Sequence, residues 1–312
     1  MHSHGLRRLD GLIWIVIVLV AATVLGAASI FGFSIAYRSF NAPAVICAVL
    51  AGAAWFYRRR RGEPKLAAAL ETTGQLMAFS AVGAPLSYLA ATAGFPRQDR
   101  LFDGMDRALN LDWLGLLAIM KRWPELSALL HFAYLSLTVQ TAVVVLLLAF
   151  TGRLAWLRVY MLAFVLAALA TIAISAVLPA EGVWLHYGLT PSAGPLPDSH
   201  TSWPVFLGLR DGSYRTIMAA GAEGIITFPS LHAALAVILM VAYWPVPVAR
   251  WIGVVLDTLM LIATPIEGSH YFVDVFAGIA IAVTSLVVAR AIVQRAHATT
   301  SATIEPALVP GR

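Results

Sequence analysis

Long apolar runs constrain this chain more than any other feature of its sequence. A transmembrane helix needs roughly 17 to 25 mostly apolar residues, and about eight runs approach or reach that length. They lie near residues 11–36, 42–57, 66–93, 124–150, 154–178, 229–249, 251–266 and 270–294. Hydrophobic residues make up 60% of the chain and charged residues 12%, against about 45 to 50% and about 25% in soluble domains. The sequence therefore predicts an all-α, polytopic membrane helical bundle.

Basic residues predict how this bundle is oriented. With the N-terminus inside the cell, 13 of the 21 Lys and Arg residues fall at cytoplasmic positions, where membrane proteins concentrate them. The run Arg58–Arg61 is the strongest marker, although such a run can also bind anionic lipids. Both termini of this cell-membrane protein are then cytoplasmic. The net charge of +5 is explained in this way, so nucleic-acid binding is not expected.

Two long polar segments, 94–123 and 179–228, lie outside the cell in this topology. Loops of this length are uncommon unless they are functional or disordered, so we expect them to form a folded cap. The first apolar run stays apolar from Leu12 to Ala36, well beyond the 7 to 15 residues of a typical signal-peptide core, and is interpreted as a retained anchor. Cys47 is the only cysteine and cannot form a disulfide within the chain.

The first motif of interest is Phe-Pro-Ser-Leu-His (228–232), at the start of the sixth run. Pro229 is expected at the first helical position, with Ser230 and His232 in the first turn. Free N–H groups and the helix dipole make such an end an anion site, to which Ser230 adds a hydroxyl and His232 a proton. These residues suit a phosphate. Alternatively, Ser230 is only a helix cap and His232 an interfacial polar residue.

The second motif places His270 and Asp274 four residues apart at the start of the eighth run. Residues with this spacing share one face of a helix, so Asp274 can orient the imidazole as in catalytic triads. Gly278, one turn further on, would allow close helix packing. The two residues could merely satisfy each other's hydrogen bonds. Ionisable residues within membrane spans are costly, however, so their presence favours a functional role.

The two motifs are expected to meet at one face of the membrane. One run separates the sixth from the eighth, so both begin outside. Two histidines can then supply a nucleophile and a general acid. Arg210 and Arg215, just before the sixth run, are the nearest candidates to neutralise a phosphate, although each could be a solvated loop charge. No metal-binding motif is present, so neither a metal nor another cofactor is expected.

Other polar residues are interpreted as structural. Asp257 lies in the middle of the seventh run and could bond to a neighbouring helix or form part of the catalytic network. It lies most of a helix away from His270, which favours the structural role. No partners are recognisable in the sequence for four further histidines, His131, His186, His200 and His297.

These motifs resemble the type 2 phosphatidic acid phosphatase superfamily, and more closely its branch that is similar to inositol phosphorylceramide synthase. The quoted motifs match the family's Pro-Ser-x-His and its final His followed four residues later by Asp. Segments 101–113 and 133–136 also look like that branch. The resemblance covers roughly residues 66–294. It implies a six-helix core at 66–295 that includes the outer loop 179–228, a two-helix addition at 1–65 and a polar tail at 296–312.

By this resemblance His270 is the nucleophile that forms a phosphohistidine, Asp274 orients it, His232 is the general acid and Ser230 a phosphate ligand. The family's Lys and Arg-Pro motif is absent, and its Ser-Arg pair reads Ala263-Thr264. The role of the missing arginine therefore passes to Arg210, Arg215 or a residue that the sequence does not identify.

The expected function is a metal-independent lipid phosphatase that cleaves a lipid phosphoester or pyrophosphate at the outer face. Phosphotransferases of this family share the active site and differ in using a lipid or polyol hydroxyl instead of water. A lipid phosphotransferase is therefore the first alternative. A non-catalytic lipid-binding or transport protein is the second, although it would leave the His270 and Asp274 pair without a purpose.

Overall fold

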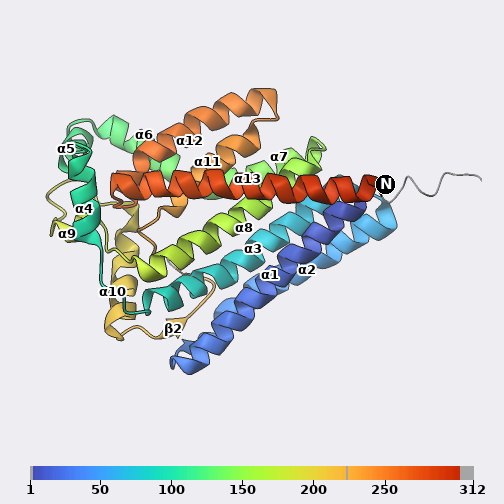
Figure 1. Ribbon diagram of the computed structural model, residues 1–312, viewed down its shortest axis with the longest axis horizontal. Helices are drawn as coiled ribbons and strands as arrows, with labels where there is room; N and C mark the ends of the chain where they lie inside the picture. The colour runs from blue at the N-terminus through green and yellow to red at the C-terminus, as the bar shows by residue number, and fades with distance from the viewer. Residues whose placement is uncertain (1–2, 223, 303–312) are drawn as a thin grey trace, which may run out of the picture.

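The computed structural model describes residues 3–222 and 224–302, and it is predominantly helical (Figure 1). Its long helices are α1 (Ser3–Ile30), α2 (Arg38–Phe56), α3 (Pro64–Ala91), α8 (Leu154–Val177), α12 (Pro247–Glu267) and α13 (Phe272–Ala302). Within the described residues the strands are two short segments, β1 (Ser34–Ile35) and β2 (Thr216–Ile217), which pair in parallel. The expected all-α helical bundle is confirmed.

A helix occupies most of each predicted apolar run, but fewer than eight have the length and composition of a membrane span. Five helices qualify alone, and a sixth does if α6 (Pro124–Leu135) and α7 (Leu137–Phe150) are one span bent by 48°. Both α3 and α11 (Leu231–Tyr243) fall outside this set. Polar residues such as Glu71 and Gln75 interrupt the first half of α3, and α11 has only 13 residues.

The boundaries of the sixth and seventh runs differ from the prediction for a local reason. Pro245 and Pro247 follow α11 closely, and proline disfavours a helix interior because it lacks an N–H donor and clashes with the preceding turn. Helix α11 therefore ends at Tyr243 rather than near residue 249, and α12 begins at Pro247, its favoured first position. At 1.5 Å per residue α11 rises only about 20 Å.

The C-terminal boundary also differs from the prediction. Helix α13 continues to Ala302, so the first part of the expected polar tail at 296–312 is helical, and residues 303–312 lie outside the described residues. The basic run after α2 forms a single π-helical turn, η1 (Tyr57–Arg61).

Helix α8 lies at the centre of the bundle, packed against α3, α11 and α13. Small residues make this close packing possible, since Ala163, Ala167 and Ala168 of α8 are buried together with Ala234 of α11 and Ala282 of α13. The first helices α1 and α2 pack beside α3 (Figure 1). A buried ion pair ties α1 to α8, where Arg158 Nη2 lies 3.0 Å from Asp10 Oδ2.

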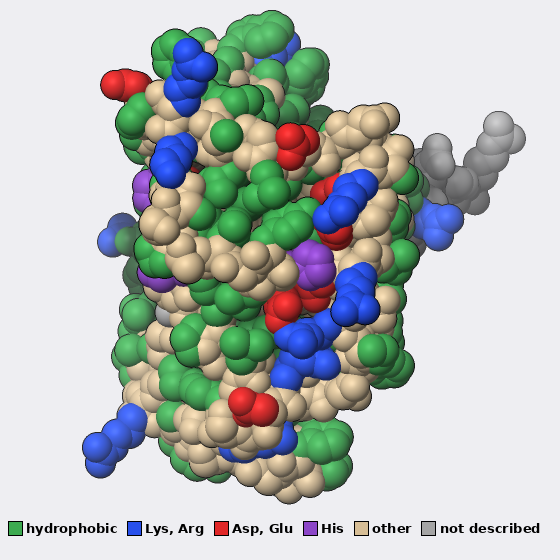
Figure 2. Space-filling model, turned by 90° about the vertical axis from the view of Figure 1, so that its left-hand side faces the viewer, with side chains coloured by type: hydrophobic (Ala, Val, Ile, Leu, Met, Phe, Trp, Pro, Cys, Tyr) green, Lys and Arg blue, Asp and Glu red, His purple; other side chains and the backbone are tan. Residues whose placement is uncertain are grey.

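The two long polar segments fold together at one end of the bundle. They contain α4 (Asp99–Ala108), α5 (Trp113–Arg122), α9 (Val183–His186), the 3₁₀ segment η2 (Asp198–Ser202) and α10 (Trp203–Asp211). A hydrophobic cluster including Phe102, Trp113, Trp184 and Tyr271 joins them to the ends of α12 and α13. This end faces the viewer in Figure 2, where acidic, basic and histidine side chains lie close together. It lies opposite the N-terminus in Figure 1.

Candidate active site

His270 lies in the short loop between α12 and α13, and each ring nitrogen has a protein partner. Nδ1 is 3.2 Å from Asp274 Oδ2, and Nε2 is 3.2 Å from Ser230 Oγ. Asp274 Oδ2 also accepts the Tyr271 N–H at 2.9 Å. His270 is 3% exposed and Asp274 is fully buried. A carboxylate at Nδ1 favours the tautomer whose Nε2 carries a lone pair, so Nε2 has the electronic form of a nucleophile.

The backbone of this loop fits closely around the imidazole. A Cβ on Gly268 would lie 2.1 Å from Cδ2 of His270, so the ring can fold back only over glycine. Ser269 has a φ of 54°, and it accepts hydrogen bonds from the N–H groups of Val183, at its carbonyl, and Trp184, at its hydroxyl. The cap segment around Gly182 thus holds the residue before His270 in place.

Ser230 caps α11, and its Oγ accepts the N–H of Ala233 at 3.3 Å. The helix begins at Leu231, so the expected position of Pro229 at the first helical residue is wrong; Pro229 precedes the cap, and its peptide bond to Phe228 is cis. Ser230 is therefore both a helix cap, as the alternative interpretation had it, and a neighbour of His270.

His232, in the first turn of α11, packs against Tyr134 of α6. Their rings stack with centroids 4.1 Å apart, and Nδ1 of His232 is 3.3 Å from the Tyr134 hydroxyl. No specific role for Tyr134 was predicted from the sequence beyond the family resemblance of its segment. Its hydroxyl lies close enough to fix which nitrogen of His232 bears the proton.

The starts of α11 and α13 are in direct contact, as the parity of the runs predicts. The Ser230 N–H donates to the Asp274 carbonyl at 3.1 Å. A Cβ on Gly278 would lie 2.3 Å from the Ser230 carbonyl oxygen. The expected close packing at Gly278 is confirmed, and it is what allows the two motifs to meet.

Two carboxylates of α4 support the second motif, and they were not identified from the sequence. Asp106 accepts the N–H groups of Phe272 and Val273 at 2.8 and 3.0 Å, at the start of α13. Asp99 accepts the hydroxyl of Tyr271 and the N–H groups of residues 181 and 182. Burial raises the pKa of Asp106, while the two N–H groups oppose that shift. The signal was present in the acidic positions of segment 101–113, but their partners are about 80 to 170 residues away in the chain.

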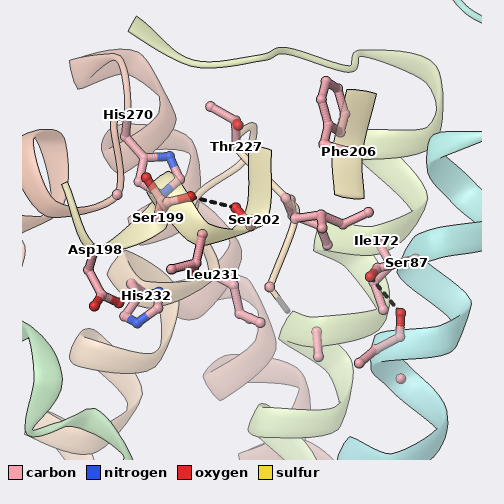
Figure 3. A pocket seen from close by; sticks show the side chains of 18 of the residues that line it. Ser87, Ile172, Asp198, Ser199, Ser202, Phe206, Thr227, Leu231, His232 and His270 are labelled. Atoms are coloured by element: carbon pink, nitrogen blue, oxygen red, sulfur yellow. Dashed lines mark hydrogen bonds between the residues drawn. The ribbon is translucent and has the colours of Figure 1, made fainter. Parts of the chain in front are cut away.

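His232 and His270 line one cavity of about 300 Å³ (Figure 3). Figure 3 shows both histidines and Asp198 at one end of it and Ile172 and Phe206 toward the other. The polar end has hydroxyl and carboxylate groups from the cap, whereas the apolar wall comes from α3 and α8 and includes Phe79, Phe164, Ala168 and Ile172. The cavity thus combines two histidines with a wall that suits an apolar chain.

The two expected phosphate ligands do not line this cavity. Arg210 lies at the end of α10, where it donates to the Phe95 carbonyl at 2.6 Å and lies over the Phe206 ring. Burial and the nearby Arg97 lower the pKa of Arg210, and Asp99 and Glu181 partly oppose this. Arg215 lies over the Phe33 ring, beside the β1 and β2 pair. Among the described lining residues the charged groups are Glu181 and Asp198, with no Lys or Arg.

The structure supplies partners for histidines that the sequence left without any. His131 Nδ1 lies 2.8 Å from Glu267 Oε2, and His200 Nδ1 lies 2.8 Å from the Pro197 carbonyl. His186 Nε2 lies 4.0 Å from Asp103 Oδ2 and its ring contacts Tyr271, whereas the side chain of His297 lies outside the described residues. Asp257 is fully buried within α12 and does not line the cavity.

A comparison with known protein families identifies the family to which this site belongs. A family model described as the PAP2 superfamily matches residues 101–288, more than half of the chain. The chain belongs to the PAP2 superfamily. The match includes both histidine motifs, the helices α11 and α12, and the cap from residue 101 onward. No curated protein and no solved structure matched the chain. Membership in the PAP2 superfamily supports a lipid enzyme of the phosphatase or phosphotransferase type.

Proposed function

We propose that this PAP2 protein is a metal-independent lipid phosphatase that works through a phosphohistidine on His270. The observation that carries the proposal is that His270 and His232 line one cavity whose other wall is apolar. A lipid phosphate can place its chain against α3 and α8 and its phosphorus at the histidines. This reading covers a phosphoester or a pyrophosphate.

In this mechanism the lone pair on Nε2 of His270 attacks phosphorus, and the bond from phosphorus to the leaving oxygen breaks. Asp274 stabilises the resulting positive imidazole through Nδ1. His232 donates a proton to the leaving oxygen and then takes one from water, which releases phosphate and restores His270. Ser230 Oγ, 3.2 Å from Nε2, is positioned to contact a phosphoryl oxygen, as are the free N–H groups at the start of α11.

A phosphotransferase of the inositol phosphorylceramide synthase type is the second candidate. The polar end of the cavity is lined by three hydroxyl groups and a carboxylate, those of Ser199, Thr201, Ser202 and Asp198. Such groups can orient an acceptor hydroxyl in place of water. Both candidates share the first chemical step. They differ only in the group that receives the phosphoryl from His270.

Product analysis tests the proposal. Purified protein is incubated with phosphatidic acid, polyprenyl pyrophosphate, phosphatidylglycerol phosphate and phosphatidylinositol, and the lipids are followed by mass spectrometry beside a phosphate assay. We expect free phosphate, inhibition by vanadate and no effect of EDTA. A new phospholipid would instead indicate transfer, and activity that EDTA removes and a divalent metal restores would contradict the mechanism. Transport without conversion would support a non-catalytic role.

We further propose that the active site lies on the outer face of the cell membrane and both termini in the cytoplasm. In a Cys47→Ser background, a cysteine replacing Ser192, exposed in the cap, should react with an impermeant maleimide in intact cells. A cysteine replacing Glu63, exposed after η1, should react only in broken cells. The reverse pattern would show that the bundle is oriented the other way.

A further inference from the structure

The charged side chains that line the cavity are negative, whereas the proposed substrate is an anion. Among the described residues that line it, the formally charged side chains are the carboxylates of Glu181 and Asp198. A phosphate beside His270 would be repelled by both. Enzymes that bind phosphate usually neutralise it with arginine in bidentate geometry. A cation must therefore reach the site from just outside the lining.

Arg97 lies at that position. Its guanidinium forms an ion pair with the Glu181 carboxylate, and Glu181 lines the cavity together with His270. The backbone around Glu181 is anchored to the loop between α12 and α13 that holds His270, because the Val183 N–H donates to the Ser269 carbonyl at 2.9 Å. Arg97 is thus held at the edge of the catalytic cavity by one of its own lining carboxylates.

A second guanidinium, that of Arg210, lies near that of Arg97. Arg210 donates to the carbonyl of Phe95, two residues before Arg97, and it is close enough to Arg97 for the two charges to repel. The other carboxylate here, Asp99, is already bonded to two N–H groups and the Tyr271 hydroxyl. The Glu181 carboxylate forms its ion pair with Arg97, and Arg210 lies near enough to interact electrostatically with Arg97, Asp99 and Glu181.

We propose that Arg97, supported by Arg210, is the phosphate ligand of this site, and that Glu181 holds its guanidinium until a substrate phosphate displaces the carboxylate. The inference rests on the proposed function in that it takes phosphate as the ligand. The exchange replaces a singly charged partner by one with more charge. The Arg97 side chain is 47% exposed and is free to turn toward a ligand, whereas the Glu181 side chain is 16% exposed and loses its ion-pair partner in the exchange.

Anion binding tests this assignment separately from catalysis. Dissociation constants for orthophosphate and orthovanadate are measured by calorimetry for the wild type and for Arg97→Ala, Arg210→Ala, Glu181→Gln, Arg215→Ala and Arg100→Ala. Removing Arg97 should weaken binding about 10- to 150-fold, the range expected for charged hydrogen bonds of 1.5 to 3 kcal/mol. Arg210→Ala should weaken it less. Glu181→Gln should strengthen binding, since the competing charge is removed. The control Arg100→Ala, at an exposed position of α4, should bind as the wild type does.

The decisive result is that anion affinity falls in Arg97→Ala and rises in Glu181→Gln. If the ion pair were only structural, Arg97→Ala and Glu181→Gln would lower the melting temperature and weaken binding alike, which would overturn the assignment. So would wild-type binding by Arg97→Ala, a larger loss in Arg215→Ala, or a wild type that binds neither anion. Anion binding with the expected order but no conversion of any lipid would uphold this assignment and contradict the proposed function.

Discussion

Replacing His270 with Ala should abolish turnover of the lipid identified by product analysis. The variant loses the Nε2 lone pair that attacks phosphorus, and we expect the rate to fall by about 10⁴-fold or more, as when a nucleophile is removed from other covalent catalysts. Acid-labile radiolabel transferred from substrate phosphate to the protein should disappear as well. Rapid quenching in alkali, which preserves phosphohistidine, followed by filter binding measures the labelled protein.

The matched control is His200→Ala. That histidine also lies in the cap, but it bonds to the Pro197 carbonyl and does not line the cavity, so its variant should retain both activity and label. A fully active His270→Ala protein would disprove the covalent mechanism. Loss of activity with the label intact would move the nucleophile to another residue.

Replacing His232 with Ala should give a different defect, because this residue acts twice. Its loss removes protonation of the leaving oxygen and later activation of water, each worth about 10²- to 10⁴-fold. With a lipid phosphate the variant should be nearly inactive. With p-nitrophenyl phosphate, whose leaving group needs little protonation, the first step should survive while hydrolysis stays slow.

The expected signature is a burst of one equivalent of p-nitrophenol followed by accumulation of labelled protein, measured by stopped flow and alkaline quench. The wild type should show a steady rate with less label at steady state. Equal losses with both substrates and no trapped phosphoprotein would contradict the assignment of His232 as general acid and base.

Local sequence patterns predicted most helices and the contacts of the two motifs, because the residues that define each pattern lie close together in the sequence. The spacing of His270 and Asp274 predicts their contact, and Gly278 predicts the close approach of two helices. The prolines after α11 are equally visible in the sequence, but a run defined by hydropathy alone does not detect them, so the predicted sixth run extends beyond the end of the helix.

The groups around the motifs could not be predicted in the same way. Asp99 and Asp106 bond to backbone N–H groups far away in the chain, and any exposed acidic loop residue would look the same in the sequence. Arg97 illustrates the same limit. Proximity in sequence favoured Arg210 and Arg215, whereas the fold brings the segment before α4 to the edge of the cavity and leaves Arg215 beside β2.

The bonds from α4 to α13 also bear on how the protein matures during synthesis. Asp106 cannot form its hydrogen bonds until Phe272 and Val273 have been synthesised, more than 160 residues later in the chain. Contacts so distant in sequence form late in folding. The bonds that hold the start of α13 against α4 therefore form only after α13 has been synthesised, so the earlier helices alone cannot assemble the cavity around His270.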